Sequence, residues 1–247
     1  MFAEESDPPV TPRTGVGAID CRDCIPDPHF GSKSIRDLYE RSKDTAGKYS
    51  VPVLWDLKEG CIVNNESSEI VDMFNSAFNG IAKNPALDLQ PAETVAAAND
   101  VNEWIYANIN NGVYRCGFAR SQEAYDRAFA DLYRSLDKCE QILSKQRYIA
   151  GDVFTIADIR LFVTLVRFDE VYVVYFKCNK KRISDYPNLH NYLRELYQMP
   201  ALQETTNMAH IKNHYFTSHP ELNILSIVPG GPGALEDLLL PHNRAKA

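Results

Sequence analysis

Val51 and Pro52 lie inside an apolar, strand-like run, where a proline is unusual. Proline cannot donate to a sheet ladder, so its presence there indicates an edge, a bulge or a cis peptide bond. A cis bond would leave the Val51 N–H and C=O facing a cleft, where they could pair with an extended peptide. We therefore expect a kinked Val51–Pro52 peptide at a binding site.

Glu66 and Ser67 follow in a polar stretch that begins a helix. Free N–H groups at a helix N-terminus bind a carboxylate, and the Ser67 hydroxyl would add another donor. Glu66 could hold an ammonium group, so both charges of an amino-acid end would be bound. This predicts a ligand such as the γ-glutamyl end of glutathione. An ordinary capped helix, with Asn65 or Glu66 as the cap, explains the same residues without a ligand.

Cysteine chemistry is less well supported. In Cys21-Arg22-Asp23-Cys24 the second cysteine is followed by prolines rather than by a helix, and nearby aspartates would raise the thiol pKa. A zinc site would need a second pair of ligands, which His29 alone does not supply. We expect no metal and identify no catalytic residue. The other four cysteines are predicted to be buried structural thiols: Cys61, Cys116, Cys139 and Cys178.

The predicted helices and strands divide the chain into four parts. Residues 1–30 form a proline-rich irregular arm, and 31–84 form a small α/β unit with a helix near Ile35, capped by Ser34. A hairpin is expected from 49–55 and 61–63, followed by a helix over 66–78. Residues 91–216 are predicted to be all-helical, and 217–247 to form an irregular tail packed back on the helices.

The helical part shows strong patterns. Apolar residues recur three or four apart across 121–145, which is typical of an amphipathic helix. Thr155 and Asp158 have the spacing of a capping box, and the helix they begin is apolar almost all round. A further helix is expected beyond Pro187.

Composition excludes several classes of protein. The 247 residues are 45% hydrophobic and 24% charged, with a formal net charge of -7. No long basic run suggests a nucleic-acid partner, and no apolar stretch approaches the roughly 20 residues of a membrane span. The acidic start lacks the features of a secretion signal, and the scattered cysteines favour a reducing compartment. We expect a soluble, cytoplasmic protein.

Several segments together resemble one family. They are 51–55, 64–69, 110–115, 155–162, 167–172, 176–179 and 213–216, and they are similar to the xi-class glutathione transferases, or glutathionyl-hydroquinone reductases. The likeness covers about residue 26 to the C-terminus. It implies a glutathione-transferase-like fold of class α/β plus all-α, in which an incomplete thioredoxin-like unit precedes a larger helical domain. A homodimer is implied by the resemblance alone.

The resemblance also implies an activity, the removal of glutathione from glutathionyl-hydroquinones by thiol exchange. Glutathione would be the co-substrate, held by Val51, Pro52, Glu66 and Ser67, and quinol conjugates the partners. Tyr114 and Tyr215 match tyrosines that the family uses around the quinol, while Tyr172 and Arg167 are weaker matches. Phenol hydroxyls there could donate a hydrogen bond or relay a proton, although any of the 13 tyrosines could instead be a core-edge aromatic.

One departure from the family is serious. Its nucleophilic cysteine lies in a Cys-Pro-Trp motif, which occurs nowhere in these 247 residues. We therefore expect either a transferase or reductase impaired or truncated in this version of the chain, or a non-catalytic binding or assembly module with the same fold. Without the family's first strand, the strand over 49–55 would have one exposed edge.

Overall fold

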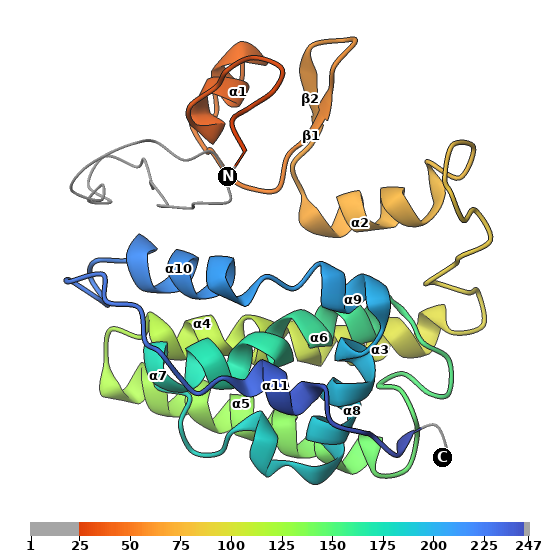
Figure 1. Cartoon of the computed structure of the whole chain (residues 1–247), viewed down its shortest axis with the longest axis vertical. Coiled ribbons are helices and arrows are strands. Elements are labelled where there is room, and N and C mark those ends of the chain that lie inside the picture. Colours follow the sequence, from red (N-terminus) through yellow and green to blue (C-terminus); the bar gives the residue numbers. More distant parts are fainter. Residues whose placement is uncertain (1–24, 245–247) are drawn as a thin grey trace. The chain divides into compact units, whose positions relative to one another are not determined.

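The computed structural model describes residues 25–244 (Figure 1). These residues form two compact units. The first contains residues 25–88 together with Phe216–Ile227, and the second contains Leu89–Tyr215 and the chain from Val228 onward. The arm predicted over residues 1–30, with Cys21 and Cys24, lies mostly outside the described residues.

The first unit is built from two helices and a hairpin. Its elements are α1 (Ile35–Arg41), β1 (Leu54–Asp56), β2 (Cys61–Asn64) and α2 (Ser67–Ser76). Ser34 caps α1, as the sequence predicted, in a capping box with Asp37. Strands β1 and β2 pair in antiparallel register, and the turn between them ends at Gly60, whose φ of 67° favours glycine.

The first strand of the hairpin is shorter than the sequence predicted. Only Leu54–Asp56 is strand, whereas residues 49–53 have no ladder pairing and bend at Val51. The reason is the proline, since Pro52 has no N–H to give to a ladder. In the part of the chain that the structure describes, β1 pairs with β2 alone, so its other edge has no partner strand.

The second unit is helical throughout. Its long members are α3 (Val95–Ile105), α5 (Gln122–Leu143), α6 (Ile156–Arg167) and α8 (Pro187–Tyr197). Shorter helices are α4 (Gly112–Gly117), α7 (Val173–Tyr175), α9 (Pro200–Glu204) and α11 (Ala234–Leu238), while α10 (Met208–Ser218) contributes to both units. Wider π-helical turns over Tyr106–Asn110 and Phe168–Tyr172 join α3 to α4 and α6 to α7.

The core of this unit follows the predicted patterns. Helix α5 buries the stripe expected from its spacing, including Leu132, Leu136 and Cys139, each 0% exposed. The capping box of Thr155 and Asp158 is present at the start of α6. The Asp158 carboxylate also accepts hydrogen bonds from the Ile149 N–H at 2.9 Å and the Tyr192 hydroxyl at 2.7 Å. One buried carboxylate thus joins three segments, although its burial raises its pKa.

The tail is less irregular than the sequence predicted, because it contains α11. Asp237 on this helix accepts a charge-assisted pair of hydrogen bonds from Arg194 of α8, at 2.7 and 2.9 Å. Farther on, the Arg244 guanidinium is 5% exposed and donates to Glu195, 3.2 Å away, and to the Gln146 carbonyl at 2.8 Å. These ionic contacts, rather than apolar periodicity, hold residues 234–244 against the helices.

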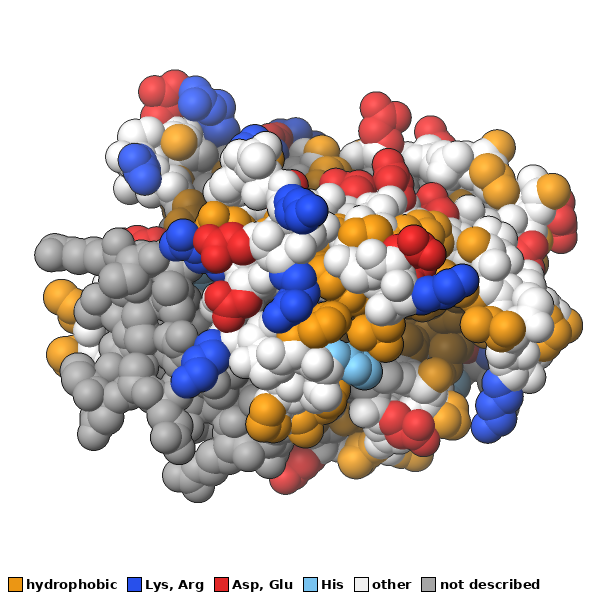
Figure 2. Space-filling view, turned by 90° about the horizontal axis from the view of Figure 1, so that it is seen from above, with side chains coloured by type: hydrophobic (Ala, Val, Ile, Leu, Met, Phe, Trp, Pro, Cys, Tyr) orange, Lys and Arg blue, Asp and Glu red, His pale blue; other side chains and the backbone are white. Residues whose placement is uncertain are grey.

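The surface mixes charges of both signs. Figure 2 shows acidic and basic side chains interspersed on the face it presents, with exposed hydrophobic side chains among them. Within residues 25–244, none of the helices combines the length and the apolar character needed to cross a membrane.

Candidate functional site

The peptide expected to bind a ligand backbone lies in the first unit. The Val51–Pro52 bond is cis, and the Val51 side chain is 57% exposed. Among the described residues, none hydrogen-bonds to the Val51 N–H or C=O, so both groups are open to a partner. The proline in this run predicted a kinked peptide, and the cis Val51–Pro52 bond is that kink.

A tyrosine that sequence reasoning missed joins the two halves of this region. The Tyr39 hydroxyl donates to the Ser50 carbonyl at 2.8 Å and accepts from the Asn65 amide at 2.9 Å. Ser50 directly precedes Val51, and Asn65 directly precedes Glu66, so one hydroxyl links both chain segments. Tyr39 is 1% exposed. Its only signal in the sequence was a place on the apolar face of α1, which gave no hint of the hydroxyl's role.

Glu66 is the N-cap of α2. Its carboxylate accepts hydrogen bonds from the Ser68 N–H at 3.3 Å and the Ser68 hydroxyl at 3.1 Å, and its own N–H donates to Asn64. Ser67, the first residue of the helix, is exposed. The structure therefore brings Ser67 and Glu66 to a helix N-terminus, and it also shows Glu66 in the capping role that needs no ligand.

The tyrosines expected around a quinol meet in the second unit. The hydroxyls of Tyr172 and Tyr215 are 2.8 Å apart, and the Tyr215 hydroxyl also bonds to that of Tyr114. They come from the π-helical turn after α6, from α10 and from α4, respectively. Tyr172 and Tyr215 are 2% and 5% exposed, whereas Tyr114 is 39% exposed. Three hydroxyls thus form a chain that runs from the core to the surface.

The three hydroxyls share two hydrogen bonds, and in each bond either oxygen can be the donor. Burial raises the pKa of Tyr172 and Tyr215, and the bond to Tyr172 partly opposes this shift at Tyr215. The neighbouring Tyr114 raises the pKa of Tyr215 further. Tyr114, the most exposed of the three, is the one that a ligand can reach.

Arg167 and two phenylalanines complete the surroundings. Arg167, the last residue of α6, donates to the Val163 carbonyl, and its charge lowers the pKa of Tyr172 and Tyr215 slightly against the effect of burial. Phe118 stacks nearly parallel to Tyr114 at 6.5 Å between ring centroids, and Phe176 lies 5.3 Å from it. Sequence reasoning missed Phe118 and Phe176 as site residues, since the pattern gave no reason to separate them from core aromatics.

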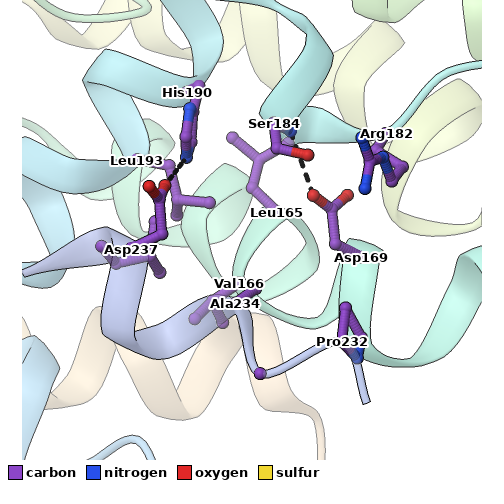
Figure 3. A pocket seen from close by; sticks show the side chains of 12 residues that line it. Leu165, Val166, Asp169, Arg182, Ser184, His190, Leu193, Pro232, Ala234 and Asp237 are labelled. Carbon is purple, nitrogen blue, oxygen red and sulfur yellow. Dashed lines mark hydrogen bonds and ion pairs between the residues drawn. The ribbon is translucent and has the colours of Figure 1, made fainter.

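A separate cavity of about 200 Å³ lies between α6, α8 and the tail. Figure 3 shows His190 and Asp237 joined at one side of it, with Nε2 and Oδ2 2.5 Å apart. On the opposite side the Ser184 N–H donates to Asp169 at 3.0 Å. The polar groups that line the cavity therefore bond to one another and hold the tail and the loop before α8 in place.

The cysteines give no nucleophile at a helix start. Cys61 begins strand β2, Cys116 lies within α4, Cys139 lies within α5, and Cys178 follows α7. All four are free thiols. Cys21 and Cys24, weighed above as a substitute, lie outside the described residues. Within residues 25–244, His, Cys, Asp and Glu side chains form no group that could hold a metal ion.

The comparisons with known proteins agree on one family. Residues 122–195 match the family described as "Glutathione S-transferase, C-terminal domain". The chain is 52% identical over 199 residues to the glutathionyl-hydroquinone reductase YqjG of Escherichia coli, covering 81% of this chain and 60% of that protein. It is 44% identical to the glutathionyl-hydroquinone reductase PcpF of Sphingobium chlorophenolicum, covering 85% of this chain and 67% of that protein.

A solved structure gives the same result. The glutathione-bound structure of YqjG superposes with a TM-score of 0.87 at 47% identity, covering 92% of this chain and 73% of that one. The predicted fold class is confirmed, with a helical C-terminal domain and an incomplete thioredoxin-like unit before it. In the sequence comparison, the chain spans about 60% of the length of the E. coli relative. It belongs to the xi-class glutathione transferases, the family of the glutathionyl-hydroquinone reductases.

Proposed function

We propose that this chain binds glutathione through its first unit and acts on glutathionyl-hydroquinones through the tyrosines of its second unit. The observation that carries the proposal is the chain of hydroxyls from Tyr172 through Tyr215 to Tyr114. It ends on the exposed phenol of Tyr114, which stacks beside the Phe118 ring. A hydroquinone offers a ring to stack on and oxygens that accept a hydrogen bond, so its chemistry matches.

Glutathione would bind beside the two segments that the Tyr39 hydroxyl joins, the one at Ser50 and the one at Asn65. The Val51 N–H and C=O would pair with its backbone, while Pro52 holds that peptide in shape. Ser67 and the start of α2 would bind the γ-glutamyl carboxylate. One Glu66 oxygen accepts from Ser68, which leaves the other for the ammonium group.

The tyrosines would assist the cleavage of the aryl carbon–sulfur bond. When a thiolate attacks the glutathionyl sulfur, the carbon–sulfur electron pair would stay on the ring carbon, which would take a proton from water as the mixed disulfide forms. Tyr114 would donate a hydrogen bond to the quinol oxygen. Hydrogen bonds from Tyr215 and Tyr172 would then stabilise the negative charge that builds up on the Tyr114 oxygen. General-acid assistance of this kind contributes about 10²- to 10⁴-fold.

These residues do not supply the attacking thiolate. No Cys-Pro-Trp occurs in these 247 residues, and the described cysteines lie in a strand, in helix interiors or after α7. We infer that these residues by themselves bind the conjugate, and that its turnover needs a thiolate supplied in addition to them. The position of the cysteines also favours a second candidate, a non-catalytic module that binds glutathione. A cytoplasmic homodimer is inferred from the family alone, and sedimentation would test the dimer.

Glutathione binding is measured first, by calorimetry with wild type, Tyr39→Phe and Tyr49→Phe. The Tyr39 variant loses the link between Ser50 and Asn65, so we expect binding to weaken about tenfold, which corresponds to the loss of one net hydrogen bond. Tyr49 is 36% exposed and packs on Tyr39 through its ring, so its variant should bind like wild type. Binding that is undetectable in wild type would refute the glutathione site.

Turnover of a glutathionyl-hydroquinone then separates the two candidates. The chain as given is compared with the same chain carrying a Cys-Pro-Trp-bearing N-terminal segment, each with and without Tyr114→Phe. Activity in the extended chain that falls at least tenfold in the Tyr114 variant supports the reductase. Glutathione binding without turnover in either chain supports the non-catalytic module.

A further inference from the structure

Two buried cysteines from distant parts of the sequence meet in the second unit. Cys116 lies in α4, and Cys178 follows α7 (Figure 1). The Cys178 thiol donates to the Phe176 carbonyl at 3.8 Å, and the two thiols lie close enough to interact electrostatically. Cys116 is 2% exposed and Cys178 is 0% exposed. The proposed reductase chemistry uses neither thiol.

The backbone around the pair is closely packed. A Cβ on Gly117 would lie 2.0 Å from the Phe176 ring, so α4 contacts the end of α7 without a side chain between them. The Tyr125 hydroxyl donates to the Lys177 carbonyl at 2.7 Å, and the Cys178 N–H donates to the Tyr172 carbonyl at 3.0 Å. Packing and hydrogen bonds therefore hold the two segments in place and keep the two thiols near each other.

One of the thiols can be reached from outside. A hollow of about 510 Å³ is lined by Cys116 and by Lys177 and Asn179, the neighbours of Cys178 in sequence. Arg120 also lines it, and both cationic side chains are exposed. Such a hollow suits a small anionic reagent, because the two cations attract it toward the Cys116 sulfur.

The two sulfurs are unequal in a way that suits sequential chemistry. The neighbouring Cys178 thiol lowers the pKa of Cys116 and outweighs the effect of its burial, and the Arg115 charge acts in the same direction. The Cys116 thiol and burial raise the pKa of Cys178. Cys116 is therefore the better thiolate, and thiolates are the attacking form in disulfide exchange.

We propose that Cys116 and Cys178 form a reversible intramolecular disulfide, with glutathione disulfide as the oxidant. The Cys116 thiolate attacks one sulfur of glutathione disulfide, which forms a mixed disulfide and releases one glutathione thiolate. The Cys178 thiol then loses its proton and attacks the Cys116 sulfur, which releases a second glutathione. Two protein thiols are oxidised and one glutathione disulfide is reduced to two glutathiones.

This bridge would join the segments that carry Tyr114 and Tyr172, since Cys116 is in the same short helix as Tyr114 and Cys178 bonds to the Tyr172 carbonyl. The proposal does not depend on the proposed function, because the hollow can take its reagent whether or not the tyrosines act on a quinol.

Peptide mapping tests the bridge directly. The whole chain is incubated with glutathione disulfide, its free thiols are alkylated, and trypsin is added without reductant. Trypsin cuts after Arg115, Arg120, Lys177 and Lys180, so the bridge would link the peptide 116–120 to the peptide 178–180. We expect this linked pair, and its disappearance after reduction. Its absence while half-exposed Cys61 carries glutathione in the same sample would refute the proposal.

Three variants test the order of events. Cys178→Ser should stop at glutathione on Cys116, because the resolving thiol is gone. Cys116→Ser should lower labelling of Cys178 about tenfold or more, because that thiol is buried and poorly ionised. Cys139→Ser, in which a lone buried thiol is removed, should still form the linked pair. Equal labelling of Cys116 and Cys178 in the two single variants would contradict the assigned order.

Discussion

The Tyr172 hydroxyl lies 2.8 Å from the Tyr215 hydroxyl, and both side chains are buried. These residues are 43 positions apart in the chain, so the pair exists only because α10 packs beside the π-helical turn after α6. A buried phenol needs a partner for its hydroxyl, and here each supplies the other's. Because Tyr172 and Tyr215 are buried, Tyr114 is the tyrosine of the three that faces outward.

Removing the central hydroxyl tests this arrangement. Tyr215→Phe leaves the buried Tyr172 hydroxyl without its hydrogen-bond partner, so we expect the free energy of unfolding to fall by about 1–3 kcal/mol. Tyr106→Phe is the matched control, because that side chain is 64% exposed and water can replace its contacts. Urea unfolding followed by circular dichroism measures both. Equal stability of the two variants would mean that the Tyr172 hydroxyl finds another partner.

A pair of glycines in α4 should respond in opposite directions. Gly117→Ala places a Cβ 2.0 Å from the Phe176 ring, and Phe176 is 0% exposed, so overpacking should cost about 1–3 kcal/mol. Gly112→Ala meets Leu132 at 3.6 Å, an ordinary contact, and should stabilise the helix by up to about 1 kcal/mol. Denaturant midpoints report both effects. A neutral Gly117 variant would show that the ring moves aside freely.

The buried ion pair of the tail gives a third prediction. Glu195→Gln leaves Arg244 buried without its counter-charge, and we expect a loss of about 3–5 kcal/mol in the free energy of unfolding. Arg134→Met removes an ion pair with Asp131 in which the arginine side chain is 76% exposed, and should cost at most about 1 kcal/mol. Thermal unfolding of both variants beside wild type is the measurement. A small effect at Glu195 would place the tail off the helices in solution.

Acid should weaken the turn at the start of the first unit. The Asp27 carboxylate accepts hydrogen bonds from the backbone N–H groups of His29, Phe30 and Ser32. These bonds lower its pKa from 3.8 to about 2. A depressed acidic pKa means that the stabilisation is fully present above pH 3.8 and is lost as the pH falls through about 2.

The measurement uses the tryptophan beside this turn. The Phe30 ring lies 5.4 Å from the Trp55 ring, so in a Trp104→Phe background the fluorescence reports on this region. Between pH 4 and pH 2, about the range of the shift, the signal should change in the parent and much less in Asp27→Asn. Asp44→Asn, which removes a carboxylate bonded to a single backbone N–H, should retain the parent's pH dependence.

Local sequence determined much of the fold. The stripe of α5 and the capping box of Thr155 and Asp158 depend on residues three or four positions apart, so their spacing alone predicts them. Pro52 shortened the first strand for an equally local reason, the lack of an N–H. The tail helix α11 was missed, because Ala234–Leu238 is too short to show a period and is held by Arg194 from far away in the chain.

Residue patterns along the chain thus predict where helices begin, which faces they bury and which family's segments are present. They do not predict that the Tyr39 hydroxyl joins Ser50 to Asn65, that three tyrosine hydroxyls share a chain of hydrogen bonds, or that Cys116 and Cys178 lie close together, because these contacts arise only in the folded chain. The physical reason is range. Hydrogen bonds along a helix act between neighbours in sequence, whereas these contacts join residues brought together only when the apolar faces pack.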